Sequence, residues 1–308
     1  MSNLYKQFNK YLVVFLGIFL MSLLSICVGW VCANNKERTP KAEDADTVGY
    51  WTNHFDSSVP GSGEASDVDI TTAAQFAWIC QSINSSNENT VYTETTFHIK
   101  NDLDFSAYYW VPMGFGSANT AVRAKFVADN VNPNRKTVKF TGIKIDNRGA
   151  DFPTYSQELN SFGLFGAIDG CNQVGQGFLS GIELVDVSIN IDVSKVASDT
   201  VNIGSLVGYF AGQQEDTNAG TREAGVINCS ATGTINITQS DSSTNKKVNI
   251  GGLVGQTGII SGTTKGAGIT YLSTSVQTNS VTLNISGATG STYNVGGLVG
   301  ANAGTIDC

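Results

Sequence analysis

The chain has 308 residues, with Lys+Arg 18, Asp+Glu 26 and a formal net charge of −8. This acidic balance excludes a nucleic-acid binder that relies on a basic face, and 34 glycines without a G-X-Y period exclude collagen. Charged residues make up 14% and apolar residues 41%, which is the composition of a chain that builds a core rather than of a disordered polyelectrolyte.

The N-terminus carries an uncharged apolar run over residues 11–33, preceded by Lys6 and Lys10. About 20 apolar residues suffice to cross a bilayer, and Val31-Cys32-Ala33 offers the small residues of a cleavage site. We interpret residues 1–33 as a signal peptide or a signal anchor, both alternatives staying open, and expect the body outside the cell. Without these residues the chain has 16 basic and 26 acidic residues, a net charge of −10.

Residues 34–68 are polar and contain Pro40 and Pro60, so we interpret them as a linker that starts to order near Tyr50 and Trp51. The segment 71–83 instead has the i, i+3, i+4, i+7 spacing of an amphipathic helix. Its apolar stripe consists of Phe76, Ile79, Cys80 and Ile83. Thr72 and Gln75 have the spacing of a capping box. We expect this helix to cover one end of the core formed by residues 69–308.

Alternating apolar and polar residues over 96–105 and 138–145 predict the first strands. Further along, related glycine-rich segments recur. They are 162–166, 201–208, 248–255 and 293–300, and their final glycines lie 42, 47 and 45 residues apart. A second series has the pattern apolar-Asn-apolar, centred on Asn190, Asn236 and Asn284, which lie 46 and 48 residues apart. A third and weaker series aligns Ile182, Ile227, Ile269 and Ile306.

Such repeats predict a β-solenoid, in which three short strands per repeat form one coil and parallel coils stack about 4.8 Å apart. Equivalent apolar residues then form internal columns. The expected columns are Ile189, Ile235, Leu283; Ile191, Ile237, Ile285; and Leu206, Leu253, Leu298. The repeated glycines allow positive φ and close backbone approach at corners. For Asn202, Asn249 and Asn294, a turn and a stacked amide ladder both stay open. The sequence ends at Cys308, inside what should be the next strand. We expect either a fragment of a longer protein, which we favour, or an exposed coil edge that meets another chain.

The repeats at 250–255 and 295–300, with Ile227-Asn228-Cys229 and residues 304–308, resemble the GLUG-motif repeat family of bacterial cell-surface proteins. The resemblance covers roughly residues 70–308. The sequence departs from the family pattern at residues 125–135. The resemblance implies a right-handed parallel β-helix on an exported protein with adhesin-like roles. Some members are attached to secreted zinc peptidases, but their His-Glu-x-x-His motif is absent here, where His54 and His98 are the two histidines.

Glycan-cleaving β-helices need clustered carboxylates with a basic residue on one face. Asp102 and Asp104 lie two apart on an expected strand, but we favour a polar face or a turn there. Four other acids form no column: Glu183, Asp186, Asp192 and Asp307. We expect His98 to face solvent, since it lies between two apolar residues.

Other residues have ordinary structural explanations. We interpret Cys229 and Cys308 as small core residues, because two coils separate them by more than the reach of a disulfide. Tyr108, Tyr109 and Trp110 suit stacking on a sugar, but we favour packing at the end of the core. Sequons are present at Asn84, Asn228, Asn236 and Asn284.

We therefore assign no catalytic residue, no cofactor and no metal ligand from the sequence. The favoured hypothesis is a non-catalytic cell-surface β-solenoid that binds a host or cell-surface ligand, either a glycan or a protein. No nucleic acid is expected as a partner, and the membrane is a partner through residues 11–33 if they are not cleaved. The alternatives are a carbohydrate-active β-helix enzyme and the targeting segment of a larger secreted enzyme.

Overall fold

The structure is a computed structural model in which the chain divides into two units, Met1–Thr47 and Val48–Cys308. The described residues all lie in the second unit. They are 49–60, 64–85, 92–93, 95–114, 121–129, 137–149, 152, 159–169, 178–211, 225–258, 271–273, 280–287 and 290–302. The predicted export segment, residues 1–33, lies outside them, as do Cys308, Asp307 and most of the predicted linker.

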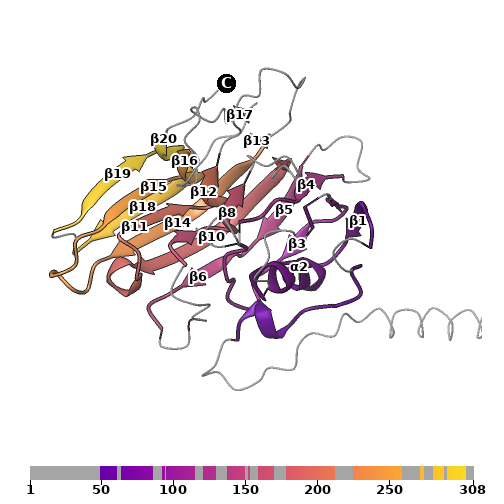
Figure 1. The fold of residues 1–308 in the computed structure, drawn as a ribbon, viewed down its shortest axis with the longest axis horizontal. Coiled ribbons are helices and arrows are strands. Elements are labelled where there is room, and N and C mark those ends of the chain that lie inside the picture. Colours follow the sequence, from indigo (N-terminus) through magenta and orange to yellow (C-terminus); the bar gives the residue numbers. More distant parts are fainter. Residues whose placement is uncertain are drawn as a thin grey trace, which may run out of the picture. The chain divides into compact units, whose positions relative to one another are not determined.

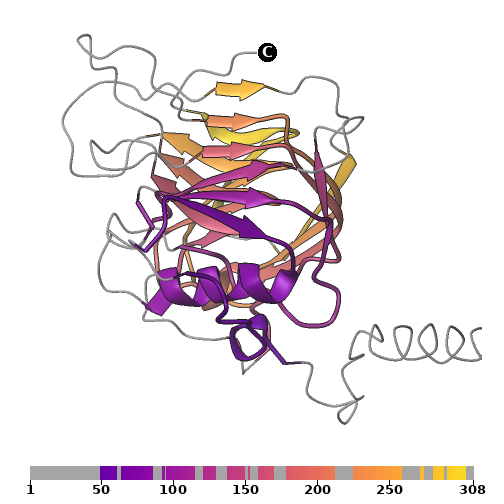
Figure 2. The ribbon, with the colours of Figure 1, turned by 90° about the vertical axis from the view of Figure 1, so that its right-hand side faces the viewer.

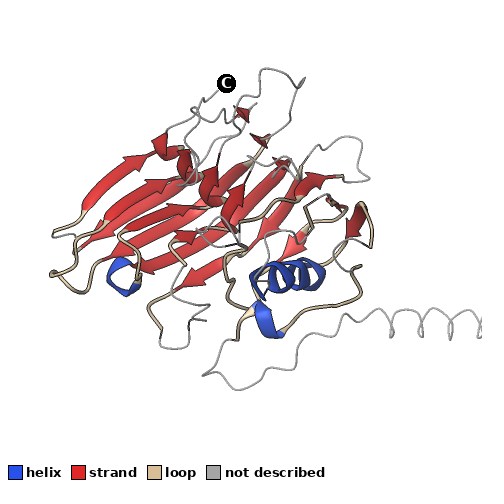
Figure 3. Ribbon diagram, viewed as in Figure 1, coloured by secondary structure: helices blue, strands red, loops and turns tan. Residues whose placement is uncertain are grey.

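The described part consists mostly of strands in parallel sheets, with little helix (Figure 3). The first sheet has the order β1 (Asp67–Ile70), β2 (Thr96–Ile99), β4 (Lys125–Ala128), β9 (Phe178–Ser180), β13 (Gly225–Ile227) and β17 (Tyr271–Ser273). The second has β3 (Leu103–Asp104), β5 (Val138–Thr141), β10 (Ile182–Asp192), β14 (Ser230–Thr238) and β18 (Ser280–Ser286), and β6 (Lys144–Asp146) also pairs with β10.

The other two sheets have four strands each. The third contains β7 (Ser161–Phe162), β11 (Thr200–Gly204), β15 (Lys247–Gly251) and β19 (Thr292–Gly296). The fourth contains β8 (Phe165–Asp169), β12 (Val207–Ala211), β16 (Val254–Gly258) and β20 (Val299–Asn302). Each sheet is an open row with two end strands rather than a closed ring. Figure 1 shows the strands of successive repeats lying side by side.

From β4 onward, the chain passes through the four sheets in a fixed order. Strands β13 to β16 contribute one strand to each sheet, and β17 to β20 do the same in the same order. The prediction of three strands per repeat is therefore wrong, and the number is four. The additional strand arises because the glycine-rich motif contains a turn: β15 ends at Gly251 and β16 begins at Val254.

The strand registers confirm two predicted columns. Ile189 pairs with Ile235, and Ile235 with Leu283. Ile191, Ile237 and Ile285 pair in the same way. The predicted alignment of Ile182 with Ile227 is wrong, because Ile182 begins β10 of the second sheet and Ile227 ends β13 of the first.

The third column lies at the turn between the third and fourth sheets. The Leu206 N–H donates to the Leu253 carbonyl at 3.0 Å, and the Leu253 N–H donates to the Leu298 carbonyl at 3.0 Å. Glycine is required here by close approach: a Cβ on Gly251 would lie 1.9 Å from the Val254 carbonyl oxygen. The expected positive φ is not the reason, since neither Gly251 nor Gly204 is among the positive-φ glycines.

The predicted helix is α2 (Ala73–Ser85), and all four residues of its predicted stripe are buried. The Gln75 N–H donates to Thr72 Oγ1 at 3.2 Å, as a capping box requires, although the Gln75 side chain accepts from the Thr71 N–H instead of returning to Thr72. Figure 2 shows α2 beside the first strands of the unit, below the stack of the sheets. Its Phe76 ring lies 5.2 to 5.8 Å from the rings of Phe105, Trp110, Phe126 and Phe140.

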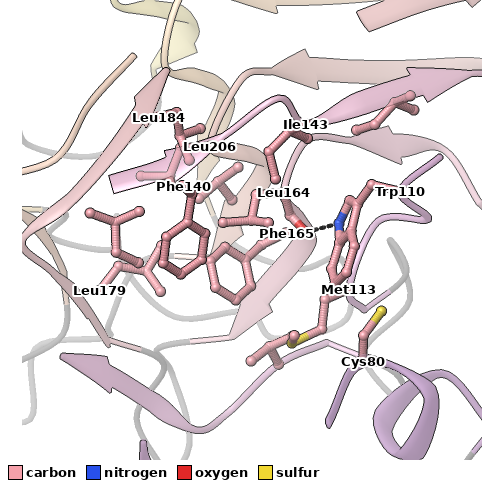
Figure 4. Packing of buried hydrophobic residues seen from close by; sticks show 14 of the residues in the cluster. Cys80, Trp110, Met113, Phe140, Ile143, Leu164, Phe165, Leu179, Leu184 and Leu206 are labelled. Atoms are coloured by element: carbon pink, nitrogen blue, oxygen red, sulfur yellow. Dashed lines mark hydrogen bonds between the residues drawn. The ribbon is translucent and has the colours of Figure 1, made fainter. Parts of the chain in front are cut away.

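Near α2 the core is aromatic, with Phe140, Phe165 and Trp110 packed among Leu164 and Met113 (Figure 4). Two short 3-10 helices complete the described helical structure, η1 (Trp51–Asn53) and η3 (Val193–Lys195). Trp51 is buried, and its indole N–H donates to the Phe105 carbonyl at 3.2 Å, so the core extends back into the predicted linker.

Candidate functional site

The densest group of charged side chains lies on the outer face of the first sheet, at β1, β2 and β4. Alternation directs Val68, Phe97 and Phe126 into the core, so the residues between them face outward. The register pairs Asp69 with His98. We define the charged cluster as Asp67, Asp69, His98, Lys100 and Asp129.

Both ring nitrogens of His98 face carboxylates. Nε2 lies 3.0 Å from Asp67 Oδ1, and Nδ1 lies 3.4 Å from Asp129 Oδ2. Lys100 Nζ lies 3.2 Å from Asp69 Oδ1 and 2.5 Å from Asp129 Oδ2. The expectation that His98 faces solvent is thus confirmed only in part: its side chain is 27% exposed and lies between two acids.

The electrostatics follow from these contacts. The hydrogen bond with His98, with a second from Ser66, holds the pKa of Asp67 below its usual value. The hydrogen bond from Lys100 lowers the pKa of Asp129, and the same bond raises the pKa of Lys100. Because the carboxylates are 51 to 67% exposed, water screens these pairs and each adds little to stability.

The composition of this cluster is that of a general acid and base site: carboxylates, an imidazole and an ammonium group from neighbouring strands. His98 and Lys100, however, each already have two carboxylate neighbours, so the polar groups of the cluster largely satisfy one another. Sequence reasoning missed the cluster because its members lie about 30 residues apart and meet only through the parallel register. The sequence does contain a signal: Asp67 and Asp69 alternate along one expected strand, as His98 and Lys100 do along another. Pairing these two strands would have predicted the cluster.

Asp102 and Asp104 do not form the acid pair considered from the sequence. Asp102 Oδ1 accepts the Lys139 backbone N–H at 2.8 Å, and Asp104 Oδ1 accepts the Ser106 N–H at 2.8 Å. The interpretation of Asp104 as a turn-forming residue is confirmed.

The scattered acids of the second sheet also have structural partners. Glu183 lies 3.7 Å from Lys139 Nζ. Asp186 has a φ of 57° at the irregularity in the pairing of β10 with β14. Asp192 is buried and accepts the backbone N–H groups of Ser194 and Ser240 at 3.0 and 3.2 Å.

A buried ion pair was not predicted. Arg123 Nη2 and Nε lie 2.7 and 2.9 Å from Asp169 Oδ2, and both side chains are less than 10% exposed. It joins the segment before β4 to the end of β8, in agreement with the bridge between Val122 and Ile168.

The aromatic triplet divides between core and surface. Trp110 is buried, and its indole N–H donates to the Leu164 carbonyl at 2.8 Å (Figure 4). Tyr108 stacks on His54 with ring centroids 3.7 Å apart. The predicted packing at the end of the core is thus confirmed for Trp110 and for the half-buried Tyr108, which packs against the core. Tyr109 is also half-buried but lies beside Tyr50 and Lys144.

The cysteines that the structure describes are buried and free, as predicted for Cys229. Burial raises the pKa of the Cys229 thiol to about 12 and that of Cys80 further, so neither is a reactive thiolate at neutral pH. Of the sequons, Asn84 is buried, and its amide donates to the Pro112 carbonyl at 3.0 Å and accepts the Gly114 N–H at 2.8 Å.

The open question about the repeated asparagines is settled in favour of a ladder. The Asn249 amide donates to Asn202 Oδ1 at 2.8 Å, and the Asn294 amide donates to Asn249 Oδ1 at 2.7 Å. A second ladder joins Asn190, Asn236 and Asn284 with two bonds of 2.8 Å. The first ladder is mostly inside: Asn249 is fully buried.

Within the described ranges, no three His, Cys, Asp or Glu side chains are grouped so as to hold a metal ion. Within the same ranges, no helix is both long and apolar enough to span a bilayer. Comparisons of the chain with family models, curated proteins and solved structures found no match.

Proposed function

We propose that this chain is an exported, cell-surface protein whose repeats form a right-handed parallel β-helix, and that it acts as a structural or adhesive segment without catalysis. The observation that carries the proposal is the in-register parallel stacking of successive repeats through four sheets. A chain that visits four parallel sheets in a constant order is what a β-helix requires. The strong preference of parallel crossovers for one hand supports the right-handed form.

The surface location is supported by the sequence: the apolar run over residues 11–33, with small residues at its end, and the resemblance to the GLUG-motif repeats. The adhesive role is supported by the arrangement of the side chains. Apolar columns fill the inside of the second sheet, and its outer face carries a row of asparagines, Asn190, Asn236 and Asn284.

The location is tested on intact cells that produce the full chain, by adding an external protease and following the repeats with an antibody. We expect the repeats to be lost while a cytoplasmic protein in the same cells stays intact. Repeats that stay intact in whole cells but are cleaved after lysis contradict the surface role. An experimental density map with left-handed passage through the sheets contradicts the proposed architecture.

The charged cluster favours a second candidate, a carbohydrate-active β-helix enzyme. Asp67 and Asp129 flank one imidazole, as a site for proton transfer requires. In this case the protein cleaves a glycan, and both Asp67→Asn and Asp129→Asn remove the cleavage while Asp102→Asn leaves it unchanged. Absence of cleavage across neutral and uronate glycans rejects this candidate.

A further inference from the structure

The outer face of the second sheet carries two parallel rows of small uncharged polar side chains. Its strand registers pair Ser188 with Thr234 and Thr234 with Thr282. Two residues further along each strand, they pair Asn190, Asn236 and Asn284. We name these six residues the polar track. Along each strand these residues alternate with the inward-facing columns of Ile189 and Ile191. Both rows therefore face outward.

The two asparagine ladders differ in their burial, and only the buried ladder is needed to satisfy amides inside the core. In the third sheet, Asn202 and Asn249 are buried, so their amides must bond to one another. In the polar track, Asn190 and Asn236 are half-buried and Asn284 is exposed. Each ladder bond uses one N–H and one acceptor position of an amide that has two donors and two lone pairs. The remaining donor and acceptor recur at every strand, about 4.8 Å apart.

The track continues into an aromatic side chain at the end nearer to α2. The register places Lys144 beside Ser188 and Asp146 beside Asn190. Next to β6, the backbone N–H of Trp110 donates to the Lys144 carbonyl, and the Tyr109 ring centroid lies 5.8 Å from Lys144 Nζ. Tyr109 is half-buried against Tyr50. From Lys144 to Thr282 the row spans three strand spacings, about 14 Å.

We propose that the polar track binds a neutral glycan chain laid across the strands, with Tyr109 as an aromatic contact at one end. The inference rests on the proposed surface function, because it names the ligand class of that surface segment. Evenly spaced neutral donors and acceptors match the hydroxyl groups of a repeating sugar polymer. The apolar body and polar tip of Tyr109 suit the mixed faces of a sugar ring.

Charge separates this ligand from the other candidates. None of the six track residues is charged. Lys144, which lies between the track and Tyr109, already donates to the Ser106 carbonyl. The track itself therefore offers no ion pair to an anionic polymer, and the chain as a whole carries a net charge of −8. A protein partner that docks on a sheet face needs an apolar centre, which the Ser, Thr and Asn rows do not provide. An uncharged polyhydroxylated chain is the class that remains.

The test is affinity electrophoresis of the purified full chain in detergent, through gels that contain dextran, mannan, laminarin or xyloglucan, with alginate as the anionic probe. We expect at least one neutral polysaccharide to retard the protein and alginate not to do so. Thr282→Glu places a charge in the track, and the bound complex must then desolvate it, so we expect about tenfold weaker binding.

Thr292→Glu is the matched control, because Thr292 is also an exposed threonine, on the last strand of the third sheet. We expect it to bind like the unchanged protein. Tyr109→Ala should also weaken binding, whereas Tyr109→Phe keeps the ring and should retain it. Equal urea midpoints for the variants establish that folding is preserved.

Three results overturn the proposal: no retardation by any of the four neutral probes, equal retardation of Thr282→Glu and the unchanged protein, or retardation by alginate alone. These outcomes are distinct from a failure of the surface function, which the protease experiment on intact cells measures without any glycan.

Discussion

At the scale of single residues, the two asparagine ladders show one side chain in two environments. The Asn249 amide donates to Asn202 Oδ1 and to Gln256 Oε1, both at 2.8 Å, with no exposure to water. Asn236 makes the equivalent ladder bonds on a half-buried outer face. Water can replace a lost partner in the second case but not in the first.

Asn249→Ala should therefore lower the free energy of unfolding by about 1–3 kcal/mol for each buried partner left without a bond. Asn236→Ala, its matched control, should cost about 1 kcal/mol or less. The measurement is the urea midpoint of both variants against the unchanged protein. An equal or larger loss for Asn236→Ala means that the buried ladder has no special stabilising role.

Asp192 makes the stability depend on acid. Burial by itself raises the pKa of its carboxyl, but hydrogen bonds from Ser240 and Ser194 more than offset this, so the pKa lies below the usual value of about 3.8. A lowered pKa means that the folded state binds the proton less tightly than the unfolded state. The stabilisation is thus present at pH values above the unfolded pKa and is lost as the pH falls through the lowered pKa.

The expected result is a shallower loss of stability for Asp192→Asn than for the unchanged protein between pH 5 and pH 2, measured as the urea midpoint at each pH. The amide keeps an acceptor for the Ser194 N–H but does not titrate. Parallel pH profiles for the two proteins contradict this role of Asp192.

Residue-level prediction from the sequence had a clear limit. Alternation correctly predicted that Ile189 and Ile191 face inward and that Asn190 does not. Alternation did not decide between a turn and a ladder for Asn249. The choice depends on which face of the strand points into the core, and the corner of the fold sets this. The charged cluster was missed for a similar reason, since His98 and Asp67 meet only once the register of β1 and β2 is known.

At the scale of elements, α2 was the most predictable piece, because its signals are local. The apolar stripe and the Thr72 cap lie within a few residues of each other. The count of strands per repeat was less predictable. The turn between β15 and β16 has only two residues, Gly252 and Leu253, so in the sequence the two strands look like one motif. The close backbone approach at Gly251 arises only in the folded corner. The sequence pattern therefore does not show that a strand ends there.

The role of α2 as a cover for the aromatic end of the core leads to the third prediction. Phe76 is fully buried and contacts rings from β4, from β5 and from Phe105, which directly follows β3. Phe76→Ala should lower the free energy of unfolding by about 3–5 kcal/mol, because it leaves a cavity between aromatic rings. Trp78→Ala is the control on the same helix, since Trp78 is only partly buried and packs against the exposed Phe55. Similar midpoint shifts for the two variants contradict the covering role of Phe76.

At the scale of the whole described unit, the two ends of the stack differ. One end is covered by α2, whereas the last described strands, β18 to β20, lie at the ends of their sheets. The columns of core residues become exposed there: Ile237 is 1% exposed, and its neighbour Ile285 in the same column is 37% exposed. In a repeat protein each repeat is stabilised by its neighbours, so the same substitution should have unequal effects along one column.

Ile237→Ala should accordingly lower the free energy of unfolding by about 2–5 kcal/mol, because it opens a cavity inside the stack. Ile285→Ala removes a side chain that water already reaches, and its cost should be about 1 kcal/mol or less. The urea midpoint measures the global effect, and hydrogen exchange of the β18 amides measures the local one. We expect Ile285→Ala to increase exchange in β18 alone, whereas Ile237→Ala should increase it in β10, β14 and β18. Equal midpoints for the two variants, or exchange that rises everywhere in both, contradict a stack whose stability is passed from repeat to neighbouring repeat.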